Sequence, residues 1–562
     1  MNHKRRMKDV SFYQLVKTIK SQDYDDEGNR FDVIMKVLKD EETGEKIVET
    51  IPDPDFTYYV TDDDYVLDEQ VNYIEKEKVR EITCSSSNIV KSVAYETGNE
   101  DFFWKCIKSK KFSAAKAVFL DPNVHGSDID LEDYYIGKHY SKYPVEQSKN
   151  EFTKGFFDIE VDSMKILGFP NPADAECPVN AISFFNDSNM TLYGLFLRNS
   201  ENPLIEEFET NRLKDFKKRM KQKYKDKGLD IKLKLIWYNE EDELSLIADF
   251  FHLINLLKPD FASGWNIFGF DIEYLINRIA QLGATPNDII CAEDIPYKYC
   301  YLSKDTKNQD PADKGDYFSV SSYTNYLDQM LLFANLRKGA GKRESYSLDA
   351  IAFEELGENK LEFKNPDTTT KNSAWMDYEE FIEYNLHDTM LLHMIEARNK
   401  DFNMIYAVAA KTETRIQKAL KKTVCLKNLA RRFYFDRGYI MSNNHNTNYG
   451  GLNETVKESF RGAFVANPLL NKPLGLVING SKSKYIFENV IDFDLTSLYP
   501  SIILAFNVDA TTQIGRIESD EFDSPKLVDD IVTRNYINIG KDYFDLPNVT
   551  DMLELLENRK IA

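Results

Sequence analysis

The pattern of apolar and polar positions divides the chain into regions of different texture. Residues 1 to about 152 carry short strand-like runs between turn residues, such as FTYYV at 56–60 and AVFL at 117–120. From about residue 153 the runs are longer and predict a series of strands: KGFFDIEV, AISFFN, LYGLFL, LKLIWY and DFASGW. Apolar residues at helical spacing predict a helix over 241–257, closed by Pro259. Strands that alternate with helices indicate an α/β domain.

Helical patterns become more frequent after this series of strands. FDIEYLINRIAQLG predicts a helix that ends at Gly283, and residues 375–400 predict a long one. More helix is expected over 403–437. Later, YIFENVIDFDL reads as a strand that a turn joins to a helix at TSLYPSIILAF, and the last residues, 549–562, are again helical in pattern.

Composition places the chain among globular intracellular proteins. Hydrophobic residues make up 42% and aromatic residues 13% of 562 residues, which excludes a mainly disordered chain. Six cysteines form no CxxC pair and do not cluster with the seven histidines, so a zinc site is not expected, and a large chain with few cysteines fits a reducing compartment. The basic start MNHKRRMKDVSF has no apolar stretch after it, and no segment reaches the ~18 apolar residues of a membrane span. We therefore expect a soluble protein without a signal peptide or a membrane partner.

Two carboxylates share one face of the first long strand. Asp158 and Glu160 stand at i and i+2 of FFDIEV, and on a strand this spacing points both side chains the same way. Apolar neighbours suggest that the strand is buried, where two adjacent carboxylates need a compensating cation. The alternative is an edge strand with a solvated acidic face.

Two further acidic elements follow at distant positions. Asp271 opens a helix after GWNIFGF, and Asn266 lies on the preceding loop; a simple helix-capping role is the alternative for Asp271. Tyr384 and Asp388 stand at i and i+4 of one helix and share a face, the alternative being an exposed Asp beside a core Tyr. His387 lies off that face and is read as non-catalytic.

Together the four carboxylates match the needs of a two-metal site for phosphodiester hydrolysis. Hard divalent ions prefer oxygen ligands. Two ions held a few Å apart can activate water and stabilise the leaving 3′-oxygen. A tyrosine beside one ligand can orient the attacking water or the scissile phosphate.

The elements FDIE, NIFGFD and YNLHD resemble the three exonuclease motifs of family B DNA polymerases, and DFDLTSLYPSII resembles the first palm motif of that family. GFPNPADAECPVNAISFF and SYSLDAIA are similar to the replicative polymerases of large tailed bacteriophages. The resemblance covers most of residues 55–562. It implies a ribonuclease H-like α/β exonuclease domain over 153–400 and a mixed α+β N-terminal domain over 1–152, rejoined by 401–447. It also implies a partial palm over 448–545 and the start of the fingers over 546–562.

The resemblance implies a role for individual residues. Asp158, Glu160, Asp271 and Asp388 match the exonuclease ligands of two Mg²⁺ ions, for which Mn²⁺ could substitute, and Tyr384 matches the water-positioning tyrosine. In the palm, spacing alone does not choose between Asp492 and Asp494, whereas the family pattern DxxSLYPS selects Asp494 as a metal ligand. The remaining matches are a metal-binding carbonyl at Leu495, nucleotide contacts at Ser497, Leu498, Tyr499 and Arg559, and DNA contacts at Asn266, Phe270, Gly462 and Ala463.

Two parts of a polymerase site are missing from these residues. No DTD motif supplies a second palm carboxylate, and no KxxxNSxYG-type segment supplies a lysine for the triphosphate. We therefore expect the N-terminal portion or subunit of a DNA-directed DNA polymerase with a complete 3′-5′ exonuclease site. A second chain would carry the rest of palm, fingers and thumb, with a sliding clamp bound through it, in the cytoplasm of an infected bacterium. The alternatives are a stand-alone 3′-5′ exonuclease, an idle nucleic-acid-binding module and a truncated gene.

The net charge of −22 opposes DNA binding only as a sum over the whole chain. Two basic stretches interrupt it. Residues 212–227 read as the solvated side of an amphipathic helix, and residues 411–437 are candidates for contacting duplex phosphate. We expect DNA binding, to primer-template and to a single-stranded 3′ end, that weakens with salt.

Overall fold

The structure is a computed structural model that describes residues 13–143, 152–164, 166, 168–445, 447–449 and 498–506. The chain forms two units, 1–457 and 458–562. In the second unit only helix α16 (Leu498–Phe506) is described. Within the described residues, no helix is both long and apolar enough to cross a membrane.

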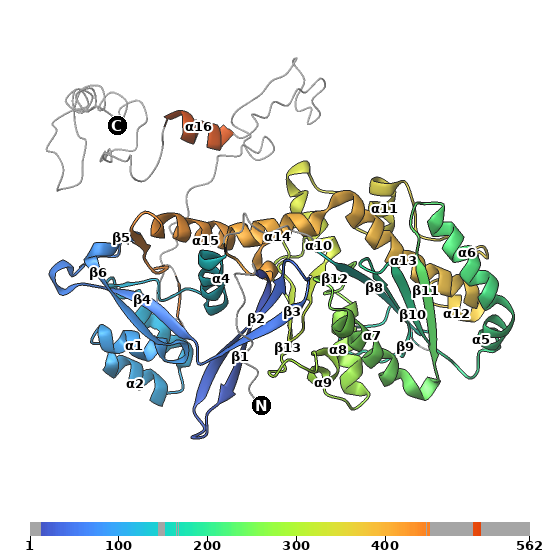
Figure 1. Cartoon of the computed structure of the whole chain (residues 1–562), viewed down its shortest axis with the longest axis horizontal. Helices are drawn as coiled ribbons and strands as arrows, with labels where there is room; N and C mark the ends of the chain where they lie inside the picture. The colour runs from blue at the N-terminus through green and yellow to red at the C-terminus, as the bar shows by residue number, and fades with distance from the viewer. Residues whose placement is uncertain are drawn as a thin grey trace, which may run out of the picture. The chain divides into compact units, whose positions relative to one another are not determined.

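The N-terminal region is built from small antiparallel sheets (Figure 1). The strands β1 (Tyr13–Tyr24), β2 (Arg30–Asp40) and β3 (Lys46–Pro52) form one sheet. A second sheet has the order β6 (Val79–Ser85), β4 (Asp55–Thr61), β7 (Val124–His125). The helices of this region are α1 (Ile89–Glu96), α2 (Glu100–Lys108), α3 (Phe112–Ala115) and α4 (Leu131–Lys142).

A six-stranded mixed sheet organises the next region, in the order β11-β10-β9-β8-β12-β15. Its first three strands along the chain form an antiparallel meander, and the other three each add in parallel to a neighbour. The strands are β8 (Lys154–Val161), β9 (Val179–Asn186), β10 (Thr191–Leu197), β11 (Lys232–Tyr238), β12 (Phe261–Gly264) and β15 (Asn325–Asp328). A separate hairpin pairs β13 (Cys300–Ser303) with β14 (Tyr317–Val320).

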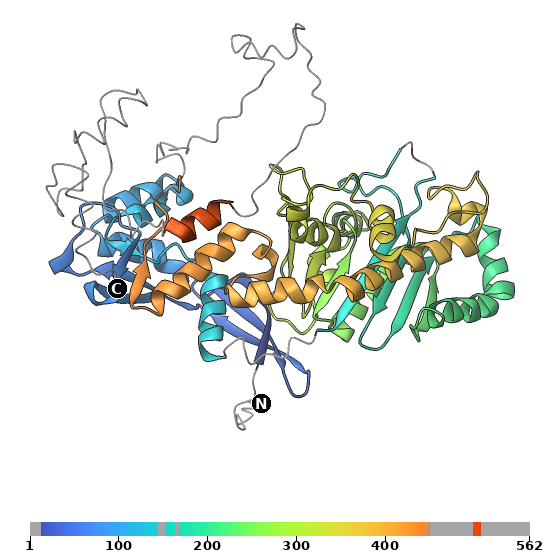
Figure 2. The ribbon, with the colours of Figure 1, turned by 90° about the horizontal axis from the view of Figure 1, so that it is seen from above.

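Helices cover both faces of this sheet. One face packs on α7 (Glu243–Leu257), α8 (Asp271–Gln281) and α9 (Pro286–Ile290). The other packs on α6 (Leu213–Lys225), α10 (Gln329–Leu336), α11 (Leu348–Leu356), α13 (Tyr378–Asn399) and α14 (Asp401–Lys411). Figure 1 draws α7, α8 and α9 below the sheet and α10, α11, α13 and α14 above it, with α6 at its outer end, and Figure 2 shows α13 lying across its face.

Close packing fixes the centre of the sheet. Gly264 ends β12 beside β8, and a Cβ at this position would lie 2.5 Å from the carbonyl oxygen of Phe157. A larger residue would therefore push the two central strands apart.

The predicted α/β fold class is confirmed, but three details differ. The run 117–120 is part of a 3₁₀ helix (Lys116–Leu120), not a strand. The alternative reading of β8 as an edge strand is wrong, because β8 lies between β9 and β12, although β12 pairs only with residues 154–156. The hydrophobic pattern did not single out the strands of the first sheet (β1, β2 and β3) or the strands β13, β14 and β15.

The C-terminal part of the first unit returns to the N-terminal region. Helix α15 (Lys422–Phe435) leads to β16 (Tyr439–Met441), which pairs with β5 (Tyr73–Glu75). Asn443 donates to the carbonyl oxygen of Phe119 at 2.9 Å. The boundaries of the four expected domains remain a prediction, and the expected palm strand lies outside the described residues.

Candidate active site: an acidic cluster

The central strand β8 delivers two carboxylates to one face of the sheet. Phe157 and Ile159 enter the core beneath α7 and α8, so Asp158 and Glu160 point the opposite way, toward α13. The strand is central because its apolar side chains are buried on both faces.

Helix α13 supplies the third carboxylate. Its first turn is capped by the Asp377 side chain, which accepts from the amide of Glu380. Two polar contacts then fix the helix on the sheet. The Asn385 amide donates to Oδ2 of Asp158 at 3.0 Å, and the hydroxyls of Ser183 and Thr389 lie 2.6 Å apart. These contacts place Asp388 over β8.

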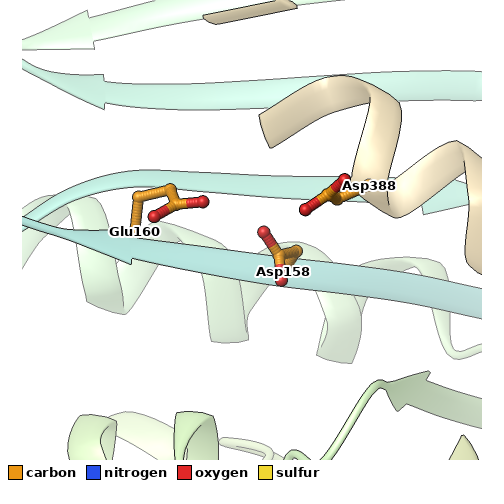
Figure 3. Close-up of side chains that lie close together, drawn as sticks. All are labelled: Asp158, Glu160 and Asp388. Carbon is orange, nitrogen blue, oxygen red and sulfur yellow. The ribbon is translucent and has the colours of Figure 1, made fainter. Parts of the chain in front are cut away.

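Figure 3 shows the result: the carboxylates of Asp158, Glu160 and Asp388 converge from the strand and the helix. One oxygen of each lies within 4.8 Å of an oxygen of the others. The sequence predicted that these three residues act together, and the fold brings them into one cluster from positions 230 residues apart.

Asp271 approaches the cluster from the end of β12 but lies outside the group of 4.8 Å contacts. It is the first residue of α8 and is buried, and its carboxylate accepts a hydrogen bond from the backbone amide of Ile159. The Asp271 carboxylate therefore contacts β8 at Ile159, between Asp158 and Glu160.

The loop that carries Asp271 is held by Asp328, which the sequence analysis missed. The Asp328 carboxylate accepts from the amides of Asn266 and Phe268, both at 3.1 Å. It also caps α10 by accepting from Met330 and Leu331. The sequence marks Asp328 only as an Asp directly before a helix, a pattern that predicts an ordinary N-cap.

Burial sets the protonation of the cluster. It raises the pKa of Asp158 well above its ordinary value, with repulsion from Glu160 and Asp388 as further causes. Burial and repulsion from Asp388 raise the pKa of Glu160 to about 8, and burial raises the pKa of Asp271 to about 7. The pKa of Asp388 is also raised by burial, although a nearby lysine opposes the rise. Carboxylates whose pKa is raised in this way are stabilised by binding either a proton or a metal cation.

The donor set fits divalent metal ions. The carboxylate of Asp388 is buried, and its Oδ1 has no hydrogen-bond partner in the described structure, so that oxygen has lone pairs to offer. All members of the cluster are oxygen donors, the type of ligand that hard divalent cations prefer.

The nearby cation is Lys360, which the sequence analysis also missed. Its ammonium lies 2.5 Å from Oδ2 of Asp388 and donates to the hydroxyl of Tyr384 at 3.0 Å. Asp349 anchors the loop by accepting from the Lys360 amide at 2.8 Å and from the Asn359 side chain at 3.1 Å. The acidic neighbours raise the pKa of Lys360. Lys360 lies in a polar loop, where no helical or strand periodicity could identify it as a neighbour of the acidic cluster.

Aromatic side chains surround this chemistry. The ring of Tyr384 stacks on Phe363 with 5.4 Å between centroids. Phe270, an expected DNA contact, packs 5.0 Å from Phe169, whose side chain is 80% exposed.

Asn266 adopts a left-handed backbone (φ 61°) and is half-buried on the loop. His387 points away, between the hydroxyl of Tyr224 and the carbonyl oxygen of Asn359.

The expected palm residues are described only in part. Leu498 begins α16, and Tyr499 on the same helix is 73% exposed. The others lie outside the described residues: Gly462, Ala463, Asp492, Asp494, Leu495, Ser497 and Arg559.

Residues 106–323 match the exonuclease domain of DNA polymerase family B. The matched stretch includes β8 and Asp271 and ends before α13. The chain is 24% identical over 392 residues to the DNA-directed DNA polymerase of Escherichia phage RB69, covering 69% of this chain and 39% of that one. It is 23% identical over 458 residues to that of Enterobacteria phage T4, covering 79% and 45%.

A eukaryotic protein shows the same likeness. The DNA polymerase delta catalytic subunit of Plasmodium falciparum is 24% identical over 353 residues, covering 58% of this chain and 28% of that one. The chain thus spans less than half the length of each of these relatives.

Proposed function

We propose that this chain, which carries an exonuclease domain of DNA polymerase family B, removes nucleotides from the 3′ end of DNA by two-metal hydrolysis. One observation carries the proposal: the carboxylates of Asp158, Glu160 and Asp388 lie within 4.8 Å of one another on a central strand and the helix above it. Asp271 stands beside them at the start of α8.

The four carboxylates would hold two Mg²⁺ ions, which supply Lewis-acid stabilisation of the phosphate and of the leaving oxygen when bound. The chain's own residues then set the geometry. The Tyr384 hydroxyl, fixed by Lys360, can hold a water or a phosphate oxygen beside Asp388. The Lys360 ammonium can stabilise negative charge that develops on the phosphate.

The exposed ring of Phe169 and its partner Phe270 offer a surface on which a terminal base can stack. Such a contact fits a frayed, single-stranded 3′ end better than a paired one. This favours proofreading as the use of the site.

The direct test is release of mononucleotides from a single strand labelled at its 3′ end, by the purified chain with Mg²⁺. We expect release with Mg²⁺ or Mn²⁺ and none with a chelator. The same strand labelled at its 5′ end should shorten one nucleotide at a time. Internal cleavage, or release from the 5′ end, would contradict the 3′-5′ assignment.

For DNA synthesis we propose that this chain supplies only part of the site. Asp494 and the carbonyl of Leu495 would hold metal, and Ser497, Leu498, Tyr499 and Arg559 would contact the nucleotide, with Gly462 and Ala463 on the template. The second carboxylate and the triphosphate lysine must come from residues outside this sequence, and the partner we propose is a second polymerase chain. Primer extension should require a polypeptide with the rest of palm, fingers and thumb; extension by residues 1–562 alone would refute this.

A further inference from the structure

Helix α6 presents five lysines along one line. Lys214, Lys217, Lys218, Lys221 and Lys225 stand at positions 0, 3, 4, 7 and 11 of the helix. At 3.6 residues per turn these positions fall within an arc of about 100° on one side of the helix, and at 1.5 Å per residue the row is ~16 Å long. We call these five residues the lysine stripe.

The apolar side of α6 is fixed in the core. Phe216, Met220 and Tyr224 are fully buried beside α13. The Tyr224 hydroxyl meets His387 at 3.2 Å, so the helix rests on the segment that carries the acidic cluster. The lysine stripe therefore sits on a rigid support and faces solvent.

The basic residues on the flank of α6 already have acidic partners. Arg219 pairs with Glu379 and Glu383, and Lys223 pairs with Glu383 at 2.9 Å. Thus α13 neutralises the flank of the helix that it touches.

The lysine stripe has no such partner within the described part of the chain. None of its five side chains makes a hydrogen bond or an ion pair there; four are exposed and Lys217 is half-buried. In a chain of net charge −22, five uncompensated lysines in one row are a marked local excess of positive charge. Figure 1 places α6 at the outer end of the sheet, beside α5 (Pro203–Glu207) and α12 (Ser373–Met376).

We propose that the lysine stripe of α6 binds a nucleic-acid backbone through its phosphates, as a contact separate from the acidic cluster. The proposal rests on the proposed function for its choice of ligand. Regular spacing of point charges suits a regular polyanion, and lysine contacts to phosphate carry no base preference. No apolar side chain interrupts the row, whereas an acidic peptide helix would ordinarily need an apolar anchor.

The test measures binding by the full chain in a chelator, so that no cleavage occurs. The probes are a fluorescent 30-nucleotide single strand and a duplex of the same length. The test variant carries K214Q, K217Q, K218Q, K221Q and K225Q. The control carries Lys→Gln at five exposed lysines of the N-terminal region that also lack partners in the described structure: Lys105, Lys108, Lys110, Lys111 and Lys116.

We expect the test variant to bind about tenfold more weakly at low salt, and the control to bind within about twofold of the parent. The slope of log affinity against log salt should fall by about 3.5 for the single strand, at ~0.7 per lost phosphate contact. Loss with either probe supports the proposal, and the probe that loses more identifies the form bound. Far-UV circular dichroism checks the fold, and the smaller variant K217Q/K218Q/K221Q should lower the slope by about 2.

Three results would overturn the proposal: unchanged affinity, equal losses in both five-residue variants, or polyglutamate that displaces the probe as well as unlabelled DNA does. The last would assign the lysine stripe to an acidic protein. Because the binding assay contains no metal ion, its failure leaves the exonuclease proposal standing. Absence of nucleotide release likewise leaves the lysine stripe untouched.

Discussion

The ammonium nitrogen of Lys360 lies 2.5 Å from Oδ2 of Asp388, at the edge of a cluster that otherwise consists of carboxylates. A cation fixed there serves two purposes. It offsets part of the repulsion among the acids, and in the proposed reaction it would stabilise the negative charge that develops on the phosphate.

Replacing Lys360 by Gln should lower kcat for nucleotide release by about 10- to 100-fold with a smaller change in KM, because the charge acts mainly in the transition state. Steady-state kinetics on a 3′-labelled single strand measures both. Lys364 is the matched control, since its side chain is 86% exposed and pairs with Glu380 at 3.0 Å. Equal effects from Lys364→Gln would contradict the role of Lys360.

Glu160→Gln should abolish nucleotide release, by about 10³-fold or more, and stabilise the chain in a chelator. The pKa of Glu160 is raised to about 8 by burial and by Asp388. Between the unfolded value of about 4.5 and pH 8, the folded state holds the proton more tightly, so the free energy of unfolding falls as pH rises.

Glutamine cannot ionise, so the Glu160→Gln variant should be more stable than the parent by about 1–3 kcal/mol at pH 8, and similar to it near pH 4.5. Thermal unfolding at the two pH values makes the comparison. A variant that is less stable than the parent at both values would count against a strained acidic cluster.

Mg²⁺ should stabilise the chain through the acidic cluster. A ligand that binds only the folded state at 100 times its Kd adds about 2.7 kcal/mol to the free energy of unfolding. Tm should therefore rise with Mg²⁺ in the parent but not in the double variant Asp158→Asn/Asp388→Asn. NaCl at matched ionic strength controls for screening, and an equal rise in both proteins would place the bound ions elsewhere.

Asp328→Ala should lower both stability and activity. It removes the acceptor of four backbone amides and leaves the amide of the buried Phe268 without a partner, at a cost of about 2–4 kcal/mol. The loosened loop displaces Asp271, so nucleotide release should also fall at least about tenfold. The exposed N-cap Ser347, which serves α11, is the control: Ser347→Ala should cost ~1 kcal/mol or less and leave activity intact.

His393 should make the chain sensitive to mild acid. Burial lowers its pKa to about 4, and its ring packs against Phe156 and Phe185. Between pH 6.5 and pH 4 the unfolded state binds the extra proton, so stability is complete above pH 6.5 and falls as pH drops through that window. His393→Phe should flatten the decline by about 1–3 kcal/mol at pH 4.5.

The control for this pH dependence is the exposed His252 on α7, since His252→Gln should leave the profile of the parent unchanged. Chemical denaturation at pH 7.5 and pH 4.5 measures the difference. A His393→Phe variant with the same acid sensitivity as the parent would assign that sensitivity to other groups.

Periodicity predicted the sheet well and the surrounding loops poorly. Strand alternation placed Asp158 and Glu160 on one face, and helical spacing placed Tyr384 with Asp388, because those rules depend only on local geometry. Lys360 and Asp328 act through loops, where a side chain's position depends on tertiary contacts that no period records. The run 117–120 has the composition of a strand but packs as a 3₁₀ helix, because burial against its neighbours overrides local preference.

One ion-pair triad limits how far the two regions of the first unit can be separated. Asp260, at the foot of β12, is fully buried, and its carboxylate meets the ammonium groups of Lys39 and Lys46 from the first sheet, each at 2.9 Å. A fragment cut at residue 152 would retain the carboxylate and its hydrogen bonds from Thr153 but lose both cations and the sheet that covers them. The region that carries the acidic cluster therefore depends on the N-terminal sheet for the two cations that pair with Asp260. A shortened protein designed for the activity of this region alone should keep that sheet.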